Sequence, residues 1–156
     1  RLQSLAYVDF APGEAVQDAL PAGGQLLGPT ICYEDAYAVE QLAVLRDATL
    51  LVNVSNDAWF GDSTAPHQHL QIARFRSLEA GRWMMRATNN GISAFIDARG
   101  RVVARTAQFV PEVLHGAVVP HTGLTPYAVV RNWPVLALCA LGLAAGFVVR
   151  RRGTRR

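Results

Sequence analysis

The sequence contains no lysine, because all fifteen of its basic residues are arginine. No residue of this chain can therefore act as a catalytic lysine. Five of the arginines lie within residues 150–156, and the first 149 residues carry ten arginines against twelve acidic residues, a net charge of −2. A mildly acidic body whose positive charge is confined to a tail argues against a nucleic-acid-binding surface.

Cysteine is nearly absent as well. Only Cys32 and Cys139 occur, in unrelated sequence contexts, so we do not expect a disulfide framework. A metal site is not expected either, because His67 and His69 are two residues apart and would diverge on a helix. We interpret both histidines as helix-start or packing residues, and the sequence gives no sign of a cofactor.

Cys32 stands where an apolar strand pattern, Gln25–Ile31, gives way to a helical pattern, Asp35–Arg46. Within the helical pattern, Val39, Leu42 and Ala43 supply the expected buried stripe. The positive end of a helix dipole stabilises a thiolate over a thiol, so a cysteine at this junction is a candidate nucleophile. The alternative is a small buried apolar side chain, the commoner fate of a free cysteine.

A second apolar run, Thr49–Ser55, predicts another strand and completes a strand–helix–strand unit. Such a crossover makes the two strands parallel, so Cys32 and the segment after Ser55 leave the sheet at the same carboxyl edge. The loop over residues 56–66 contains two large aromatic residues, Trp59 and Phe60. They either pack into the core or form an exposed lid or apolar contact surface.

The remaining segments predict mainly core structure. Arg1–Gly24 is rich in Pro and Gly and predicts an irregular segment, whereas His67–Thr88 predicts one long helix with Gly81 as an internal weak point. Ile92–Asp97 and Arg101–Thr106 predict a hairpin. We also expect one more strand over Val113–Val119.

Near the end of the chain, seventeen residues from Trp133 to Val149 carry no charge. As a helix they would span about 25 Å, the short end of transmembrane length. A buried core helix is the alternative, but Tyr127 and Trp133 precede the run as interfacial aromatics and arginines follow it directly. We predict a membrane helix with a cytoplasmic tail and a body on the opposite face, divided as residues 1–131, 132–149 and 150–156.

Four blocks of sequence, in order, resemble the apolipoprotein N-acyltransferases, the membrane branch of the nitrilase-like or carbon-nitrogen hydrolase superfamily. They read I-C-Y-E at residues 31–34, S-N-D-A-W-F-G-D at 55–62, T-N-N-G-I at 88–92 and T-G-L-T-P-Y at 122–127. The resemblance implies an α/β fold, a four-layer α-β-β-α sandwich on the periplasmic face of the bacterial inner membrane. It also implies transfer of an acyl chain from a phospholipid to the terminal amine of an apolipoprotein through a cysteine thioester, without a cofactor.

By the same resemblance, Cys32 matches the nucleophile, and Tyr33 and Glu34 match neighbours that the family requires. A carboxylate two residues after the nucleophile can orient polar groups or hold the amine, although Glu34 can also be only a helix-start acid. We expect Glu34 to take part in catalysis and Tyr33 in substrate binding. Asn56, Trp59 and Phe60 are expected to bind substrate too.

The superfamily uses a Glu-Lys-Cys set, and this chain departs from it, because it lacks lysine and the matching base glutamate. The first residue is Arg1 rather than methionine, so we expect the chain to be the C-terminal piece of a longer enzyme, inactive by itself. A degenerate relic is the alternative. Two other functions stay open: a soluble nitrilase-type amidase, and a non-catalytic membrane-anchored module that binds lipid or lipoprotein.

Overall fold

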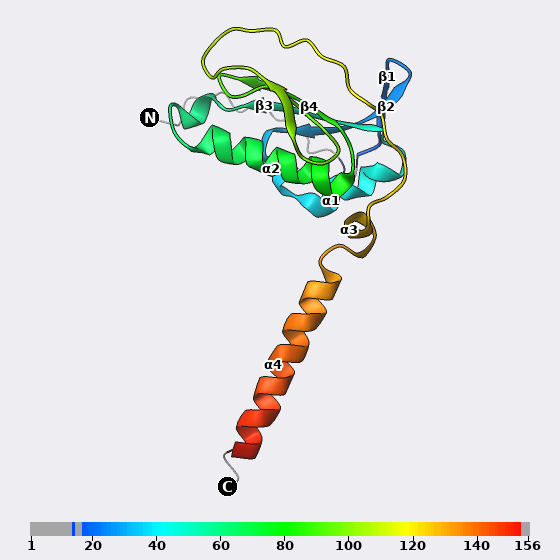
Figure 1. Ribbon diagram of the computed structural model, residues 1–156, viewed down its shortest axis with the longest axis vertical. Helices are drawn as coiled ribbons and strands as arrows, with labels where there is room; N and C mark the ends of the chain where they lie inside the picture. Colours follow the sequence, from blue (N-terminus) through cyan, green and yellow to red (C-terminus); the bar gives the residue numbers. More distant parts are fainter. Residues whose placement is uncertain (1–13, 15–16, 154–156) are drawn as a thin grey trace.

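The fold is built on a mixed sheet of six strands, in which neighbours along the chain are also neighbours in the sheet. The computed structural model describes residue 14 and residues 17–153, except the side chains of residues 39, 40, 148, 149, 152 and 153 (Figure 1). The strands are β1 (Leu20–Ala22), β2 (Gln25–Ile31), β3 (Leu50–Asn56), β4 (Met84–Asn89), β5 (Ala94–Ile96) and β6 (Val102–Arg105).

The three strands β2, β3 and β4 run parallel; β1 pairs antiparallel with β2, β5 with β4, and β6 with β5. Ile31 pairs with Val54, and Asn56 pairs with Asn89, so the three strands end at one edge of the sheet. The predicted parallel arrangement is therefore confirmed, and Cys32 and the residues after Asn56 leave the sheet at the same edge. The segment Arg1–Gly24, predicted to be mostly irregular, contains the short strand β1 near its end, where the chain turns back into β2. Residues 1–13 and 15–16 lie outside the described residues.

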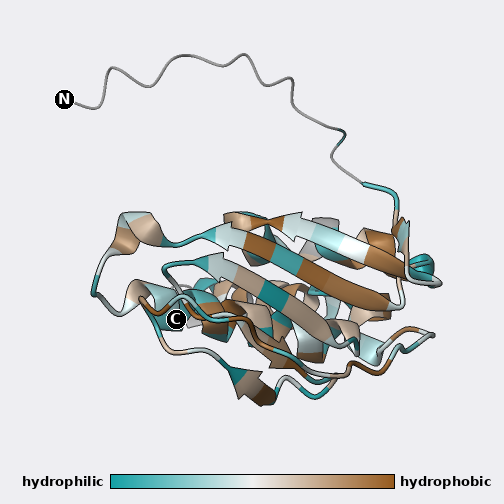
Figure 2. Cartoon of the chain, turned by 90° about the horizontal axis from the view of Figure 1, so that it is seen from above, coloured by the Kyte–Doolittle hydropathy of each residue, from teal (hydrophilic) through white to brown (hydrophobic). Residues whose placement is uncertain are grey.

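The helical connections pack against one face of the sheet, as Figures 1 and 2 show together. The predicted single helix Asp35–Arg46 is wrong, because this segment forms three short pieces: η1 (Cys32–Ala36), α1 (Ala38–Ala43) and η2 (Val44–Arg46). Tyr37, with φ −96° and ψ 86°, leaves the helical region and separates η1 from α1. The tighter turn of η1 carries Asp35 inward, where its side chain is completely buried. Of the predicted stripe, Leu42 is buried, while the side chain of Val39 is outside the description.

Helix α2 (Ala65–Ala80) is shorter than predicted, because Gly81 ends it. Gly81 takes φ 63° and ψ 34°, and its N–H donates back to the carbonyls of Ser77 and Leu78. This is a left-handed helix end of the kind that glycine favours. The chain then reverses into β4, so the prediction of a helix through Thr88 is wrong. Met84, predicted on a helix, lies fully buried in β4 instead.

The hydrophobic core lies between α2 and the sheet and is formed mainly by aliphatic side chains. Its most deeply buried members are Leu45, Leu51, Ala73, Met84 and Ile96. The opposite face of the sheet carries no helix among the described residues and exposes Ile31 and Val54.

The segment 107–123 crosses near this open face as an irregular strand-like connection (Figure 1). Gly116 lies so close to Phe95 that a Cβ there would come within 2.7 Å of the ring. The predicted strand Val113–Val119 is wrong, because this segment has no strand structure and approaches the sheet through the contact of Gly116 with Phe95. The predicted hairpin is present as β5 and β6, with both strands shorter than expected.

Two further helices complete the chain. Helix α3 (Pro126–Val130) is capped by Thr125, whose hydroxyl accepts from the Ala128 N–H and donates to the Glu79 carbonyl at the end of α2. Helix α4 (Trp133–Gly153) then projects away from the sheet (Figure 1). Its apolar side chains are exposed, including Leu138 and Leu143. Within the described part of the chain, no helix has both the length and the apolar character needed to cross a membrane.

We predict that Gly81→Ala lowers the free energy of unfolding by more than Gly23→Ala. Both glycines have a φ near 60°, where an alanine costs about 1–2 kcal/mol. At Gly81 the new Cβ would also meet Thr125 Cγ2 at 2.8 Å, whereas nothing lies within 4 Å at Gly23. Thermal unfolding of the two variants measures the difference. Equal losses would show that the contact between α2 and the start of α3 is unimportant.

Candidate active site

Cys32 lies at the turn from β2 into η1, at the carboxyl edge of the parallel strands. Its side chain is partly buried and unpaired with any other cysteine. Its backbone has φ 52°, in the left-handed region that residues other than glycine rarely adopt. Such a conformation costs roughly 1–3 kcal/mol and persists only where the surrounding structure enforces it. The predicted nucleophile is thus held in a strained turn.

The two residues after Cys32 have different surroundings. Glu34 is exposed, and its carboxylate accepts a hydrogen bond from the Ile31 N–H at 2.7 Å. This contact closes the turn around Cys32, so Glu34 stabilises the position of the cysteine as well as facing solvent. Tyr33 is also exposed, and its ring lies edge-on to Tyr37 and 6.3 Å from the His69 ring.

The aromatic loop lies after β3, on the same edge. Asn56 accepts from the Ala58 N–H at 3.1 Å and so begins the short helix η3 (Ala58–Phe60). Trp59 is 71% exposed and Phe60 is 40% exposed. Neither aromatic side chain is part of the core, and both present apolar surface beside the site.

A buried group of polar side chains, here called the charge cluster, lies behind Cys32. It consists of Asp35, Asn53, Asp57, His69 and Arg86, all less than 5% exposed. Arg86 donates to Asn53, to Asp35 at 3.2 Å and to Asp57 at 3.1 Å. His69 Nδ1 lies 2.9 Å from Asp57, and its Nε2 lies 3.1 Å from Asp35.

The charge cluster contains two carboxylates and two cations, because His69 is protonated. Burial lowers the pKa of His69 most strongly, but its hydrogen bonds to Asp35 and Asp57 outweigh burial and the charge of Arg86, raising the pKa to about 9. Burial raises the pKa of Asp57, while hydrogen bonds from His69 and Ser55 and the charge of Arg86 hold it below its usual value. Each buried charge therefore has an opposite charge beside it.

Most of the charge cluster was not predicted from the sequence. His69 was interpreted as a helix-start or packing residue, and the other four members were not singled out. One signal was present: Asn53 and Arg86 each follow a buried apolar residue, Leu51 and Met84, at the next position on the same face of the strand. Figure 2 shows such hydrophilic segments within the apolar central strands. A polar residue in a buried strand predicts a buried polar partner.

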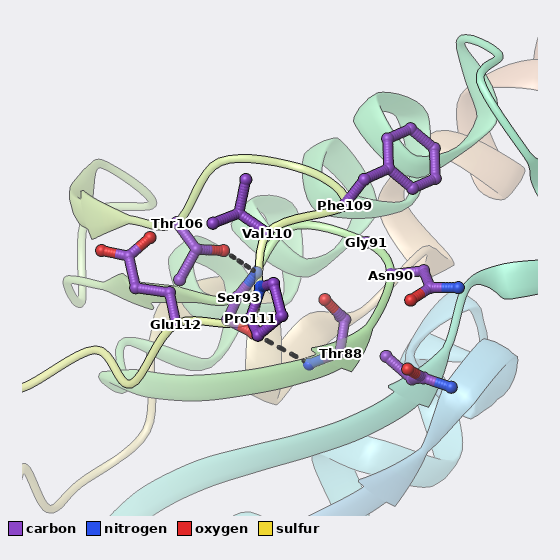
Figure 3. A pocket seen from close by; sticks show the side chains of 10 residues that line it. Thr88, Asn90, Gly91, Ser93, Thr106, Phe109, Val110, Pro111 and Glu112 are labelled. Atoms are coloured by element: carbon purple, nitrogen blue, oxygen red, sulfur yellow. Dashed lines mark hydrogen bonds between the residues drawn. The ribbon is translucent and has the colours of Figure 1, made fainter.

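A cavity of about 230 Å³ lies beyond the carboxyl end of β4 (Figure 3). Two hydrogen bonds tie its wall together: Thr88 N–H donates to Ser93 Oγ at 3.0 Å, and Ser93 N–H donates to Thr106 Oγ1 at 3.1 Å. Phe109 points away from these polar side chains in Figure 3. Cys32 does not line this cavity, so the cavity and the cysteine are separate features of the same edge.

We predict that the free energy of unfolding decreases as the pH rises through the pKa of His69. The folded-state pKa of about 9 lies above the ordinary 6.5, so the contribution is complete below pH 6.5 and is lost as the pH passes 9. The difference between these two pKa values corresponds to a contribution of at most roughly 3 kcal/mol to the free energy of unfolding. Denaturant unfolding across this range should show the decrease, and His69→Gln should be destabilised and lack it. His67→Gln, at an exposed position on the same helix, should retain it; an unchanged pH dependence in His69→Gln would contradict the assignment.

Comparison with known proteins agrees with this geometry. The family model for carbon-nitrogen hydrolases matches residues 7–127. The chain is 51% identical over 148 residues to an apolipoprotein N-acyltransferase of Methylococcus capsulatus, and 49% identical over 151 residues to one of Azotobacter vinelandii. These matches cover 95% and 97% of this chain but only 29% of each relative, so the chain spans less than a third of their length.

A solved structure shows the same fold. The carbon-nitrogen hydrolase from Helicobacter pylori superposes with a TM-score of 0.54 at 17% identity, covering 63% of this chain and 42% of that one. The family model matches most of the sequence, and the shared fold agrees with that match. The chain belongs to the carbon-nitrogen hydrolase family.

Proposed function

We propose that this chain supplies the cysteine-bearing part of an apolipoprotein N-acyltransferase, with Cys32 as its nucleophile. The observation that carries the proposal is the identity of about 50% to curated N-acyltransferases, which extends over nearly the whole chain and hence across the Cys32 turn. The position of Cys32 supports the proposal. Cys32 lies at the carboxyl edge of the parallel strands, and α/β folds bind their ligands at that edge. Both relatives compared above carry the name apolipoprotein N-acyltransferase.

The proposed reaction has two steps. The Cys32 thiolate attacks the ester carbonyl of a phospholipid, forming a thioester, and the lysophospholipid leaves as an alcohol that takes up a proton. The terminal amine of an apolipoprotein then attacks the thioester, forms the amide, loses a proton and restores the cysteine. Splitting the exchange in this way replaces one difficult step by two easier ones.

Other residues of the carboxyl edge take supporting roles in this proposal. Tyr33, Trp59 and Phe60 are exposed beside Cys32 and contact the acyl chain, while Asn56 shapes the loop that presents the two aromatics. Glu34 keeps the Cys32 turn closed and lies near the position of the incoming amine. The general base and the oxyanion-stabilising lysine come from parts of the enzyme outside this sequence, because it contains no lysine. The chain alone is therefore inactive in acyl transfer.

We propose further that the open sheet face meets a second sheet, which would complete a four-layer α-β-β-α sandwich on the periplasmic side. Its exposed apolar side chains, such as Ile31 and Val54, support this. Helix α4 is proposed to be a membrane helix. Its charge-free run of about 25 Å is shorter than a typical hydrocarbon core, so Trp133 and the arginines after Val149 would reach the interfaces at either side.

The first prediction from this function is that Cys32 becomes acylated and Cys139 does not. The open reading frame that encodes this chain, expressed in membranes and supplied with phospholipid but no acceptor, should accumulate a thioester that neutral hydroxylamine cleaves. Cys32→Ser should abolish the adduct, because an alcohol is a far weaker acid than a thiol and needs a stronger base. Cys139→Ala should retain it. An adduct that survives in Cys32→Ser, or that peptide mass maps to Cys139, would refute the assignment.

A second prediction concerns the aromatic loop. Replacing Trp59 and Phe60 together by serine should slow acylation of Cys32 while the melting temperature stays close to that of the parent, because both side chains are exposed. Acylation rates from phospholipid vesicles and thermal unfolding give the two readouts. Loss of cooperative unfolding would instead place these aromatics in the structural core of the complete enzyme.

A third prediction concerns topology. A tag after Arg156 should be protected from a protease that is added outside the inner membrane and cannot cross it, because arginines after a membrane helix favour the cytoplasmic side. A tag of the same kind in the loop over residues 97–100, on the body, should be cleaved. Rapid cleavage of the C-terminal tag would reverse the proposed orientation.

A further inference from the structure

The strained conformation of Cys32 needs a physical cause within the fold. A residue with a Cβ at φ 52° is less stable there than in the common regions of backbone space. The Glu34 carboxylate holds the Ile31 N–H on one side of the turn. No hydrogen bond joins this carboxylate to Cys32 itself among the described residues, so the conformation of the cysteine also depends on other groups.

The carbonyl oxygen of Cys32 has two buried partners from different elements. Asn53 Nδ2, on β3, donates to it at 3.1 Å, and His69 Nε2, on α2, lies 3.3 Å from it. A carbonyl oxygen only accepts, so His69 must be the donor. Asn53 Nδ2 also donates to Thr30 Oγ1 at 3.0 Å, and Thr30 lies two residues before the cysteine, in β2. Asn53 therefore links the Thr30 side chain and the Cys32 carbonyl, one on each side of Ile31, to β3.

The charge cluster determines which way these donors face. Arg86 can only donate, so it binds the Asn53 oxygen and turns the amide nitrogen toward Cys32. An ionised Asp57 only accepts, so His69 Nδ1 must carry a proton. The single proton on Nε2 is shared between Asp35 and the Cys32 carbonyl. Both ring nitrogens are therefore donors, as in an imidazolium. The buried charges specify one orientation of each side chain.

We infer that Asn53 and His69 are positioning residues, which hold the Cys32 carbonyl and keep the cysteine in its left-handed conformation. The φ of residue 32 sets the direction in which its Cβ and Sγ leave the turn. Holding that angle aims the thiol at the acyl carbonyl before substrate arrives. The identity of the nucleophile rests on the proposed function. That Asn53 and His69 hold the backbone of Cys32 does not depend on any reaction.

The kinetic test uses the full open reading frame in membranes and compares three variants. Asn53→Ser removes the amide donor but leaves all four charged groups in place, and His69→Gln replaces the charged second donor by a neutral, more flexible amide. Ser55→Ala is the matched control, because Ser55 bonds Asp57 at 2.8 Å but has no contact with Cys32. Asn53→Ser and His69→Gln should slow thioester formation at saturating phospholipid by roughly ten- to a hundredfold, with little change in KM. Ser55→Ala should stay within about twofold.

Alkylation of Cys32 by iodoacetamide distinguishes a wrongly oriented thiol from an unfolded site. A small reagent that approaches from any direction should react at rates within about threefold of the parent in all three variants. Equal slowing of acylation in Asn53→Ser, His69→Gln and Ser55→Ala would overturn the inference, because a general loss of stability would explain it. Failure of both positioning variants to unfold cooperatively, while Ser55→Ala does, would also overturn it and assign the cluster to folding alone.

A second test needs no activity and therefore separates this inference from the proposed function. With the turn held at positive φ, Cys32→Gly should melt at a higher temperature than Cys32→Ala, since glycine alone is unstrained there. In an Asn53→Ser background the difference should shrink toward zero, and in a Ser55→Ala background it should persist. A difference that is unchanged by Asn53→Ser would show that Asn53 does not hold the turn. Absence of a thioester in the unmodified enzyme, with this cycle as expected, would reject the acyltransfer reaction only.

Discussion

The pairing of two carboxylates with two cations in the protein interior is the constraint on which the rest of the site depends. Asp35, Asp57, His69 and Arg86 are each almost completely removed from water. A single buried charge without a partner costs several kcal/mol, so no member can be lost cheaply. Because the four charges sum to zero and every contact is a hydrogen bond, the cluster is stable only when its elements meet in one arrangement.

The members of the cluster come from every element that surrounds the cysteine. Asp35 lies on η1, Asn53 on β3, His69 on α2 and Arg86 on β4, and Asp57 begins the loop that carries the exposed aromatics. The cluster therefore joins the order of the parallel strands to the geometry of one turn. Gly91 completes the enclosure, since a Cβ at this position would come within 2.3 Å of the Asp57 carboxylate.

Much of this arrangement could be predicted from sequence, and the reasons for success and failure are physical. The apolar runs around Leu27 and Leu51 predicted two parallel strands, and the change from a strand pattern to a helical pattern placed Cys32 at the end of the first, because these signals are local. Gly81 was interpreted as a weak point within a helix, since periodicity alone does not show that the chain reverses there. The charge cluster stayed hidden because its members lie up to 51 residues apart, and only the tertiary fold brings Asp35 to Arg86.

The most direct test of this account is the protonation state of the His69 ring. Nitrogen-15 NMR of histidine-labelled protein, with His69 assigned by comparison with His69→Gln, distinguishes an imidazolium from either neutral tautomer. The account predicts that both ring nitrogens carry protons near neutral pH and that the ring titrates at about 9. A neutral ring near neutral pH, with one nitrogen lacking a proton, would leave either Asp57 or the Cys32 carbonyl without its donor and would contradict the account.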